Sequence, residues 1–332
     1  MVDLKGKRIL YLGPPFFGYE ADIQKTLVAK GARVDFFNER VFVSSLGKIL
    51  VRLGIRFLIN NAIKNHYSYI LTCASKQPYD FLFVVSPETM TPGFVSAIKK
   101  INPHIKTVLY MWDSIKNKNN SDHLLPLFDK TLTFDPSDRL LFPDVKFLPL
   151  FFVAEFSNDA KPISNPTHSV SFIGTVHSDR YKLVTSIVNQ FKGAKGVPYT
   201  FFYCPSKFLY VLKKIFTKEF HGIKISDVSF KSLSKTEVFN VFSSSNIVID
   251  IEHPSQKGLT MRTIEMLASG RKLVTTNSEV INYDFYNKLN ICVVDRHNPT
   301  VPKAFIEFEY TPVDPVIVSK YSLSSWLDNI FG

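Results

Sequence analysis

Residues 250–277 read DIEHPSQKGLTMRTIEMLASGRKLVTTN. The apolar run at residues 247–251 predicts a strand that leads into this segment, and the apolar spacing over residues 260–268 predicts a helix. Gly270 then predicts a turn, and residues 272–276 (KLVTT) predict a second strand. A strand, a glycine-containing loop, a helix and another strand in this order are typical of a parallel α/β domain.

The loop before this helix is the first candidate site. Lys257, Gly258 and Leu259 precede the helix, and Thr260 is predicted to cap it. A helix N-terminus offers free N–H groups and the positive end of the helix dipole, which together favour a phosphate group. Glycine allows a close approach of the backbone to a ligand, and Lys257 adds a positive charge. We therefore expect a phosphorylated ligand here.

Arg262 and Glu265 lie three residues apart, near one face of the predicted helix. In one interpretation they form a solvated ion pair with a structural role. In the other, the arginine holds a phosphate and the glutamate accepts hydrogen bonds from the ribose hydroxyls of a nucleotide. The neighbouring glycine loop and the strand–helix–strand frame favour the second interpretation.

Both halves of the chain show the same alternation of strands and helices. Parallel strands need crossover connections, so the pattern predicts an α/β protein with two doubly wound Rossmann-like domains facing a cleft. A chain of 332 residues also exceeds what one core usually supports. The predicted domains are residues 1–155 and 168–318, with a polar linker over residues 149–167. A C-terminal helix within residues 319–332 is expected to pack back on the N-terminal domain. The predicted strands are residues 7–13, 34–37, 81–85, 107–111, 130–134, 146–148, 168–173, 199–203 and 290–295, besides the two above.

A resemblance to a known family extends this picture. Residues 258–275 are similar to G-L-x-x-R-x-x-E-x-L-x-x-G-x-x-L-x-T in the donor domains of GT-B glycosyltransferases, in the CgeB-like and lipopolysaccharide-biosynthesis branch. FIGTVHSDRY at residues 172–181 resembles the first loop of those domains. The resemblance is weaker for GYE at residues 18–20 and YMWDS at residues 110–114.

The resemblance implies roles for the donor site. Glu265 would bind the donor ribose, while Arg262 and the Gly258 loop would hold the diphosphate. Many retaining relatives carry a second glutamate seven residues earlier, where this chain has Lys257. That lysine suits a phosphate or a carboxylated sugar, so retention and inversion both stay open. Enzymes of this class need no bound metal and no cofactor.

The first loop of the donor domain completes the expected site. By the same resemblance, Gly174 and Thr175 would lie against the phosphates from the other side, and Arg180 is a further candidate phosphate contact. His177 and His253, like His104, are expected to do little beyond hydrogen bonding.

The N-terminal half is expected to bind the acceptor. Gly13, Phe17 and Gly18 follow the first predicted strand, either in a loop that lines the cleft or in a plain turn between strand and helix. An inverting transferase needs a base for the acceptor hydroxyl. Asp113, just after a predicted strand, is the first candidate, although such an aspartate also caps helices. The further candidates, in order, are Glu88 and Glu20.

The composition restricts the partners. A formal net charge of +11 fits an anionic ligand or surface, and no nucleic-acid-binding signature is present. Three separated cysteines, the lack of a signal-peptide pattern and the lack of a spanning apolar stretch predict a cytoplasmic protein. Residues 46–64 and 207–218 combine lysines or arginines with large apolar residues. They predict either peripheral contact with the anionic cytoplasmic face of the inner membrane or ordinary helices packed on a core.

Together with the family resemblance, these observations predict a transferase that moves a sugar from a nucleotide-sugar to a saccharide or lipid-linked saccharide. The resemblance alone implies a role in cell-surface polysaccharide or lipopolysaccharide synthesis. The alternatives are a sugar-nucleotide epimerase of the same fold and a catalytically inactive nucleotide-binding protein. The donor sugar, the nucleobase, the acceptor and the oligomeric state stay open.

Overall fold

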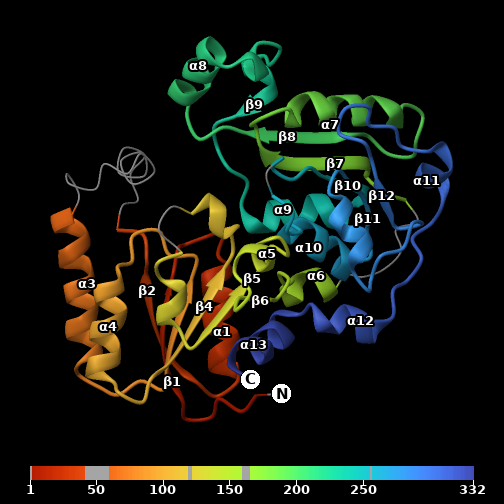
Figure 1. Ribbon diagram of the computed structural model, residues 1–332. Coiled ribbons are helices and arrows are strands. Elements are labelled where there is room, and N and C mark those ends of the chain that lie inside the picture. Colours follow the sequence, from red (N-terminus) through yellow and green to blue (C-terminus); the bar gives the residue numbers. More distant parts are fainter. Residues whose placement is uncertain (1, 42–59, 119–121, 159–164, 255) are drawn as a thin grey trace. The chain divides into compact units, whose positions relative to one another are not determined.

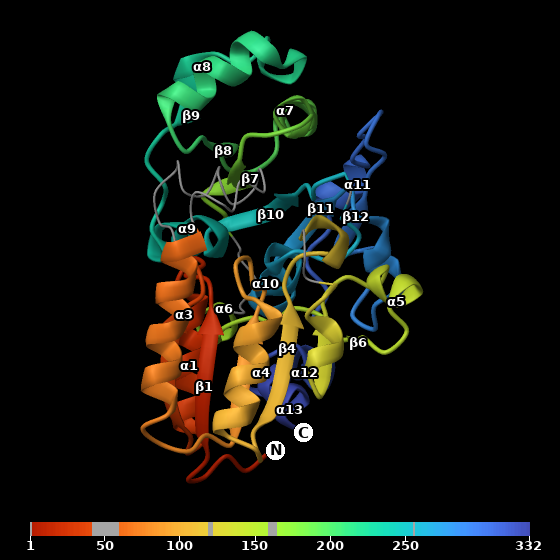
Figure 2. The ribbon, with the colours of Figure 1, turned by 60° about the vertical axis from the view of Figure 1, so that its left-hand side comes forward.

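The chain divides into two compact units. The computed structural model describes residues 2–41, 60–118, 122–158, 165–254 and 256–332. The first unit comprises Met1–Leu150 and Leu323–Gly332, and the second comprises Phe151–Ser322. Each unit is built on its own parallel sheet, with helices on its faces (Figures 1 and 2).

The sheet of the first unit has six parallel strands in the order β2-β1-β3-β4-β5-β6. Apolar runs such as FLFVV in β3 are buried along their whole length, as expected for strands covered on both faces. The strands are β1 (Arg8–Gly13), β2 (Arg33–Asn38), β3 (Phe81–Val85), β4 (Lys106–Met111), β5 (Lys130–Thr133) and β6 (Lys146–Phe147).

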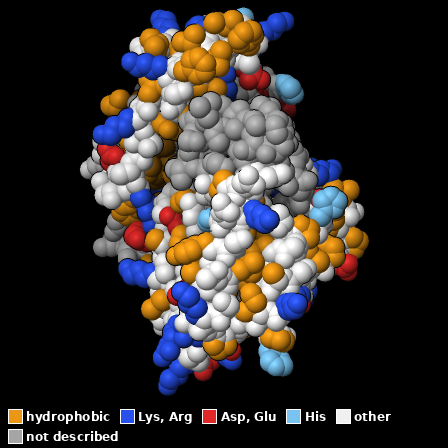
Figure 3. All heavy atoms as spheres, turned by 90° about the vertical axis from the view of Figure 1, so that its left-hand side faces the viewer, with side chains coloured by type: hydrophobic (Ala, Val, Ile, Leu, Met, Phe, Trp, Pro, Cys, Tyr) orange, Lys and Arg blue, Asp and Glu red, His pale blue; other side chains and the backbone are white. Residues whose placement is uncertain are grey.

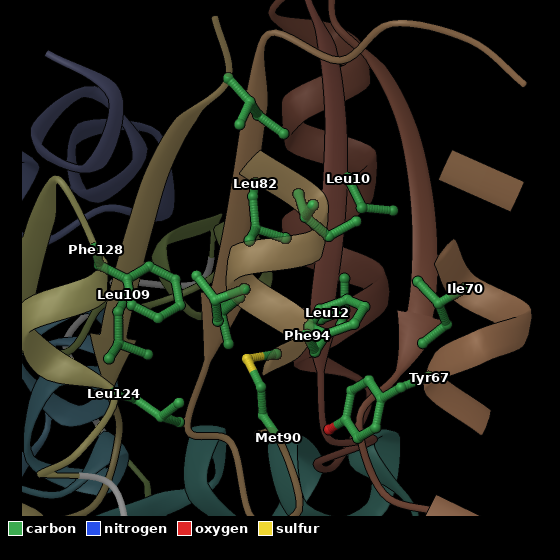
Figure 4. Packing of buried hydrophobic residues seen from close by; sticks show 14 of the residues in the cluster. Leu10, Leu12, Tyr67, Ile70, Leu82, Met90, Phe94, Leu109, Leu124 and Phe128 are labelled. Carbon is green, nitrogen blue, oxygen red and sulfur yellow. The ribbon is translucent and has the colours of Figure 1, made fainter. Parts of the chain in front are cut away.

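Helices cover both faces of this sheet. Tyr67 and Ile70 of α3 (Asn60–Ala74) and Phe94 of α4 (Pro92–Ile101) pack against strand residues such as Leu10 and Leu82 (Figure 4). Helix α13 (Leu323–Phe331) belongs to the same unit and packs beside α1 (Tyr19–Ala29). The helix α5 (Asp138–Leu141) is a single turn.

A buried aromatic residue and an ion pair are among the contacts that hold helix α13. Trp326 is almost completely buried, with its ring 4.7 Å from that of Tyr110 and 6.0 Å from that of Phe83. Lys30 at the end of α1 lies 2.9 Å from the carboxylate of Asp328. The last helix of the chain thereby closes a core made by the first 150 residues.

The sheet of the second unit is also six-stranded and parallel, in the order β12-β11-β10-β7-β8-β9. The strand-order reversal lies between β7 and β10, and ligands of such sheets bind outside the carboxyl ends of the strands at this point. The strands are β7 (His168–Thr175), β8 (Tyr199–Tyr203), β9 (Val228–Ser229), β10 (Ser245–Asp250), β11 (Lys272–Thr275) and β12 (Ile291–Val293).

Local capping sets several helix ends in this unit. Ser234 and Glu237 form a capping box at the start of α9: Ser234 accepts from the N–H of Glu237, and the Glu237 carboxylate accepts from the N–H of Ser234. Gly270 ends α10 in the left-handed conformation, with φ 62°. The helices are α6 (Ala154–Asn158), α7 (Arg180–Val188), α8 (Lys207–Phe216), α9 (Lys235–Ser243), α10 (Met261–Ser269), α11 (Lys303–Glu307) and α12 (Pro315–Lys320).

Each predicted strand is confirmed, whereas the short strand β9 and the helix α3 were not predicted, and two further segments differ from the prediction. Part of the predicted linker is ordered: Phe151, Phe152 and Val153 are buried, and α6 follows them. Burial of apolar side chains against a nearby core is favourable even when the neighbouring residues are polar and predict a linker. The basic segment at residues 46–64 lies outside the described residues except for its end, where residues 60–64 begin α3.

Candidate functional site

The glycine loop (residues 257–259) follows the carboxyl end of β10, and a side chain just beyond β11 holds it in place. The side-chain amide of Asn277, just beyond β11, donates to the carbonyls of Lys257 and Gly258, at 3.0 and 3.3 Å. Leu259 is buried, so the loop is anchored on its inner side. Lys257 is 64% exposed and lies 3.6 Å from the carboxylate of Glu279. The loop thus presents a lysine to solvent next to the start of α10.

The prediction that the Thr260 side chain caps α10 is wrong. Thr260 occupies the N-cap position, but its hydroxyl donates to Asp250 Oδ2 at 2.7 Å. Thr263 donates to the same oxygen at 2.8 Å. A carboxylate at the end of β10 attracts both hydroxyls, so the N-terminal N–H groups of α10 are left without a side-chain cap. This is the arrangement in which a helix N-terminus receives an anion.

Arg262 and Glu265 form an ion pair whose carboxylate is buried. Arg262 Nε lies 3.3 Å from Glu265 Oε2, and the two side chains are 20% and 2% exposed. The Arg262 guanidinium also lies 3.8 Å from the ring centroid of Phe242 in α9, in cation–π geometry. The interpretation of a solvated surface pair is therefore wrong. Taking a carboxylate out of water is costly unless it is paired, so this position is not an ordinary helix surface.

Gly174 and Thr175 at the end of β7 contact Arg180 at the start of α7. Arg180 Nη1 donates to the Thr175 carbonyl at 3.0 Å, and its Nη2 donates to the carbonyl of Ile251. A Cβ on Gly174 would lie 2.7 Å from Phe172 Cζ and 3.4 Å from Arg180 Nη1. Burial lowers the pKa of Arg180 to about 10, so the side chain remains a cation at neutral pH. The fold thus holds this positive charge between the ends of β7 and β10.

The loop between β7 and α7 has a strained backbone. Ser178 has φ 47°, a left-handed conformation uncommon for a residue with a side chain. His177 lies beside His253, with ring centroids 5.6 Å apart. Burial, followed by the charge of Arg180, lowers the pKa of His177 to about 4, so its imidazole is neutral at physiological pH. Strained loops that persist in a fold often belong to functional sites.

Arg296 is the residue of this site that the sequence analysis missed. Its guanidinium binds both carboxylate oxygens of Asp179, at 2.8 and 3.0 Å. It also donates to Glu252 Oε1 at 2.7 Å and to the Glu252 carbonyl at 3.0 Å. Arg296 thereby ties the loop after β7 to the loop after β10. It directly follows a predicted strand (residues 290–295), which is the position where a site residue is sought.

A pocket lies at the carboxyl ends of β1, β3 and β4 in the first unit. Two of the predicted catalytic residues, Asp113 and Glu20, line it, and the third, Glu88, is linked to it by ion pairs. Aromatic and cationic residues that were not predicted line it too. The lining residues are Tyr11, Pro14, Phe16, Tyr19, Glu20, Arg40, Val85, Ser86, Trp112, Asp113 and Lys118.

Charges in this pocket are fixed by a short chain of ion pairs. Lys118 lies 3.0 Å from Asp113 and 3.0 Å from Glu88, and Arg40 lies 2.9 Å from Glu88. Although burial opposes it, the charges of Lys118 and then Arg40 lower the pKa of Glu88. Burial likewise disfavours the ammonium, yet Asp113 and Glu88 raise the pKa of Lys118. Of the two carboxylates paired with Lys118, Asp113 is the more accessible: its side chain is 52% exposed, against 21% for Glu88.

The predicted loop after β1 is strained next to this pocket. Phe17 has φ 52° and Gly18 has φ 85°. Gly13, Phe17 and Gly18 do not line the pocket, but their neighbour Phe16 does, with its ring 5.8 Å from that of Trp112. The N–H of Phe16 donates to the Glu20 carboxylate at 2.9 Å. The loop therefore contributes the Phe16 ring to the pocket lining, while Gly18 allows the left-handed turn of its backbone.

Two kinds of feature are absent from the described residues. No group of three or more His, Cys, Asp or Glu side chains among them is arranged to hold a metal ion. Within the same part of the chain, every helix is too short or too polar to cross a lipid bilayer.

Comparison with known proteins shows the fold. No protein-family profile matches the chain, and no curated protein matches it in sequence. An α,α-trehalose-phosphate synthase (UDP-forming) from Burkholderia vietnamiensis is similar in structure, with a TM-score of 0.61 and 10% identity over 98% of this chain and 99% of its own. The lipopolysaccharide outer core galactosyltransferase WaaB has a TM-score of 0.56 and 11% identity over 98% and 99%. A UDP-GlcNAc 2-epimerase from Methanocaldococcus jannaschii has a TM-score of 0.52 and 11% identity over 98% and 100%.

These likenesses confirm the predicted fold class. The chain has two Rossmann-like units of the kind found in GT-B glycosyltransferases. Identities of 10–11% show the fold and do not assign an activity. The predicted CgeB-like branch and the interdomain cleft stay predictions.

Proposed function

We propose that this chain is a glycosyltransferase that moves a sugar from a nucleotide-sugar donor to a saccharide or lipid-linked saccharide. The observation that carries the proposal is the start of α10. Its cap hydroxyl is turned to Asp250, which leaves the helix N-terminus open to an anion beside the buried carboxylate of the Arg262–Glu265 pair. A GT-B fold with such a site in its second unit is built to bind a nucleoside diphosphate.

The residues of this site have separate roles in the proposal. The uncapped N–H groups of α10 and the Lys257 ammonium would bind the diphosphate, with Arg180 on the β7 side of the sheet. The Glu265 carboxylate would accept hydrogen bonds from the ribose hydroxyls, and Arg262 would hold that carboxylate in place. Because these groups bind phosphates more tightly as negative charge develops on the leaving diphosphate, they would stabilise the transition state.

The pocket of the first unit would bind the acceptor. The faces of Trp112 and Phe16 suit the apolar face of a sugar ring, and the carboxylates of Asp113 and Glu20 suit its hydroxyls. In an inverting reaction Asp113 would take the proton of the acceptor hydroxyl, with Lys118 holding the carboxylate in position. The proposal covers retention as well as inversion.

The setting of the reaction follows from similarity. The resemblance to lipopolysaccharide-biosynthesis transferases and the structural likeness to WaaB support a role in cell-surface polysaccharide or lipopolysaccharide assembly. The names of the synthase and the epimerase both specify uridine nucleotides, which supports a UDP-sugar donor. We place the enzyme in the cytoplasm, at the inner face of the membrane, and without a bound metal or cofactor.

A thermal-shift screen against UDP, GDP, CMP, dTDP and ADP tests the donor site. A ligand at a hundred times its dissociation constant stabilises the folded state by about 2.7 kcal/mol. We expect UDP to raise Tm in the wild type, and the shift to shrink in Glu265→Gln and in Lys257→Gln. The exposed Lys257 can be replaced without disturbing the fold, and Lys303→Gln, another exposed lysine of the same unit, is its matched control. No response of the folded wild type to any nucleotide would refute the proposal.

The structural likeness to an epimerase supports a second candidate. An epimerase converts a free UDP-sugar without an acceptor, whereas a transferase releases UDP in step with an acceptor product. Incubation of the purified protein with UDP-sugars, with and without saccharide acceptors, separates the two. Nucleotide binding with no turnover in either case, and no effect of Asp113→Asn, would instead indicate an inactive nucleotide-binding protein.

A further inference from the structure

Helix α8 in the second unit carries its apolar side chains on the outside. Phe208 and Phe216 are 73% and 77% exposed, and Val211 and Ile215 are also exposed. The opposite side of the helix is anchored: Tyr210 is buried, and its hydroxyl donates to the carbonyl of Ile223 at 2.8 Å. The interpretation of residues 207–218 as an ordinary helix with its apolar side on the core is therefore wrong.

The exposed residues form one continuous surface. Positions 208, 211 and 215 follow the i, i+3, i+7 spacing of a single helix face, and Phe216 borders it. We call these four side chains the α8 apolar face. Figure 3 shows hydrophobic side chains gathered at the top of the view, where α8 lies, with lysine or arginine side chains around them. A large aromatic residue at each end of a short helix is unusual on a surface exposed only to water.

Lysines border the α8 apolar face. Residues 207–218 (KFLYVLKKIFTK) contain four lysines and no acidic residue. Lys207 and Lys218, at the two ends, are exposed. Lys213 lies 5.0 Å from the ring centroid of Phe220, and Lys214 donates to the carbonyl of Ile223. The ammonium groups of Lys213 and Lys214 thus contact the fold on the flanks of the helix, whereas Lys207 and Lys218 are exposed.

We propose that α8 is a membrane-docking element that lies in the plane of an anionic lipid surface. The α8 apolar face would enter the boundary between headgroups and acyl chains, and the exposed Lys207 and Lys218 would contact the lipid phosphates. A two-fold contact between copies of this chain would bring like-charged lysines together, and a neutral partner would leave them unpaired. An anionic lipid surface offers both an apolar layer for the face and phosphate groups for its charged border. The role of this docking rests on the proposed function, because a transferase that uses a lipid-linked acceptor finds that acceptor at such a surface.

Vesicle co-sedimentation of the full chain tests this inference without donor or acceptor. The probes are vesicles of phosphatidylcholine alone and of phosphatidylcholine mixed with phosphatidylglycerol. The variants are Phe208→Ser/Phe216→Ser for the apolar face and Lys207→Gln/Lys218→Gln for the border. Phe308→Ser is the matched control, because Phe308 is an exposed phenylalanine of the same unit away from α8. All the replaced side chains are exposed, so the variants are expected to fold.

We expect the wild type and Phe308→Ser to bind the mixed vesicles but not the neutral ones. Added salt should weaken this binding. The phenylalanine double variant should bind roughly tenfold or more weakly, and the lysine double variant several-fold more weakly. Equal binding of the phenylalanine variant and the wild type, equal binding to neutral vesicles, or a lipid-free dimer that the phenylalanine variant dissociates would each overturn the proposal. The nucleotide-induced Tm shift, measured on the same samples, reports separately on the proposed transferase function.

Discussion

Replacing Arg296 by methionine should weaken the second unit in a way that depends on pH. In the folded protein this guanidinium pairs with Glu252, whose side chain is 8% exposed, and with Asp179, whose side chain is 41% exposed. Methionine keeps much of the volume and removes all the donors. The pair between Arg296 and Asp179 faces water, so it contributes at most about 1 kcal/mol to the free energy of unfolding. Leaving the buried Glu252 carboxylate without its cation costs about 2 kcal/mol more, for a total near 3 kcal/mol at neutral pH.

The two carboxylates respond differently to pH. Burial raises the pKa of Glu252, against the opposing hydrogen bond from Thr276 and the charge of Arg296. Without Arg296 that pKa should rise further, so the folded state would bind a proton that the unfolded state does not hold. Stability then falls as pH rises through this interval. The hydrogen bond from Arg296 lowers the pKa of Asp179, and this contribution is complete above the unfolded pKa, so it is constant between about pH 5 and neutrality.

The assay is thermal unfolding of the wild type and of Arg296→Met at neutral pH and near pH 5. A loss of about 3 kcal/mol corresponds to a fall in Tm of roughly 8 °C for a unit of this size. The fall should be smaller near pH 5, because protonated Glu252 no longer needs a cation. Glu252→Gln in the same background should restore part of the loss, and Lys303→Met, which breaks an exposed pair with Glu307, should leave Tm unchanged. A fall in Tm that is the same at both pH values, or no rescue by Glu252→Gln, would refute the reasoning.

Two further predictions concern packing in the same unit. Gly174→Ala should destabilise by about 1–3 kcal/mol, because its Cβ would meet the buried ring of Phe172 at 2.7 Å. Urea unfolding measures this, with Gly93→Ala, where nothing lies closer than 4.0 Å, as the control that should not destabilise. Lys272→Met should cost about 2 kcal/mol in the same assay, since the buried ammonium donates to the carbonyls of Phe305, Ile306 and Phe308 at the end of α11. Unchanged stability in Lys272→Met would mean that those carbonyls find other donors.

Much of the architecture is determined locally. The apolar run at residues 247–251, the helical spacing that follows and the turn at Gly270 each depend on neighbours a few residues away. Periodicity and backbone preference are encoded over such short distances, so the order of strands and helices could be predicted. The parallel pairing of the strands could be predicted too, because alternating strands and helices supply the crossover that a parallel connection needs. The capping box at Ser234 and Glu237 was predictable for the same reason.

The candidate site depended on contacts that no local pattern contains. The hydroxyl of Thr260 could cap its own helix, but an aspartate ten residues earlier in the chain lies closer to it in the fold. Arg296 meets Asp179 across 117 positions, and only the order of the sheet brings them together. The glycine loop was visible in the sequence, whereas the groups that hold it were not.

The same division applies to the surface of the molecule. The sequence by itself determined that residues 207–218 form a basic, amphipathic helix, because amphipathicity follows from spacing alone. It could not determine which side of that helix meets the protein. Tertiary packing decided this, since the buried Tyr210 turned the phenylalanines outward. Burial is a property of the whole fold, set by what surrounds a side chain in space and not along the chain.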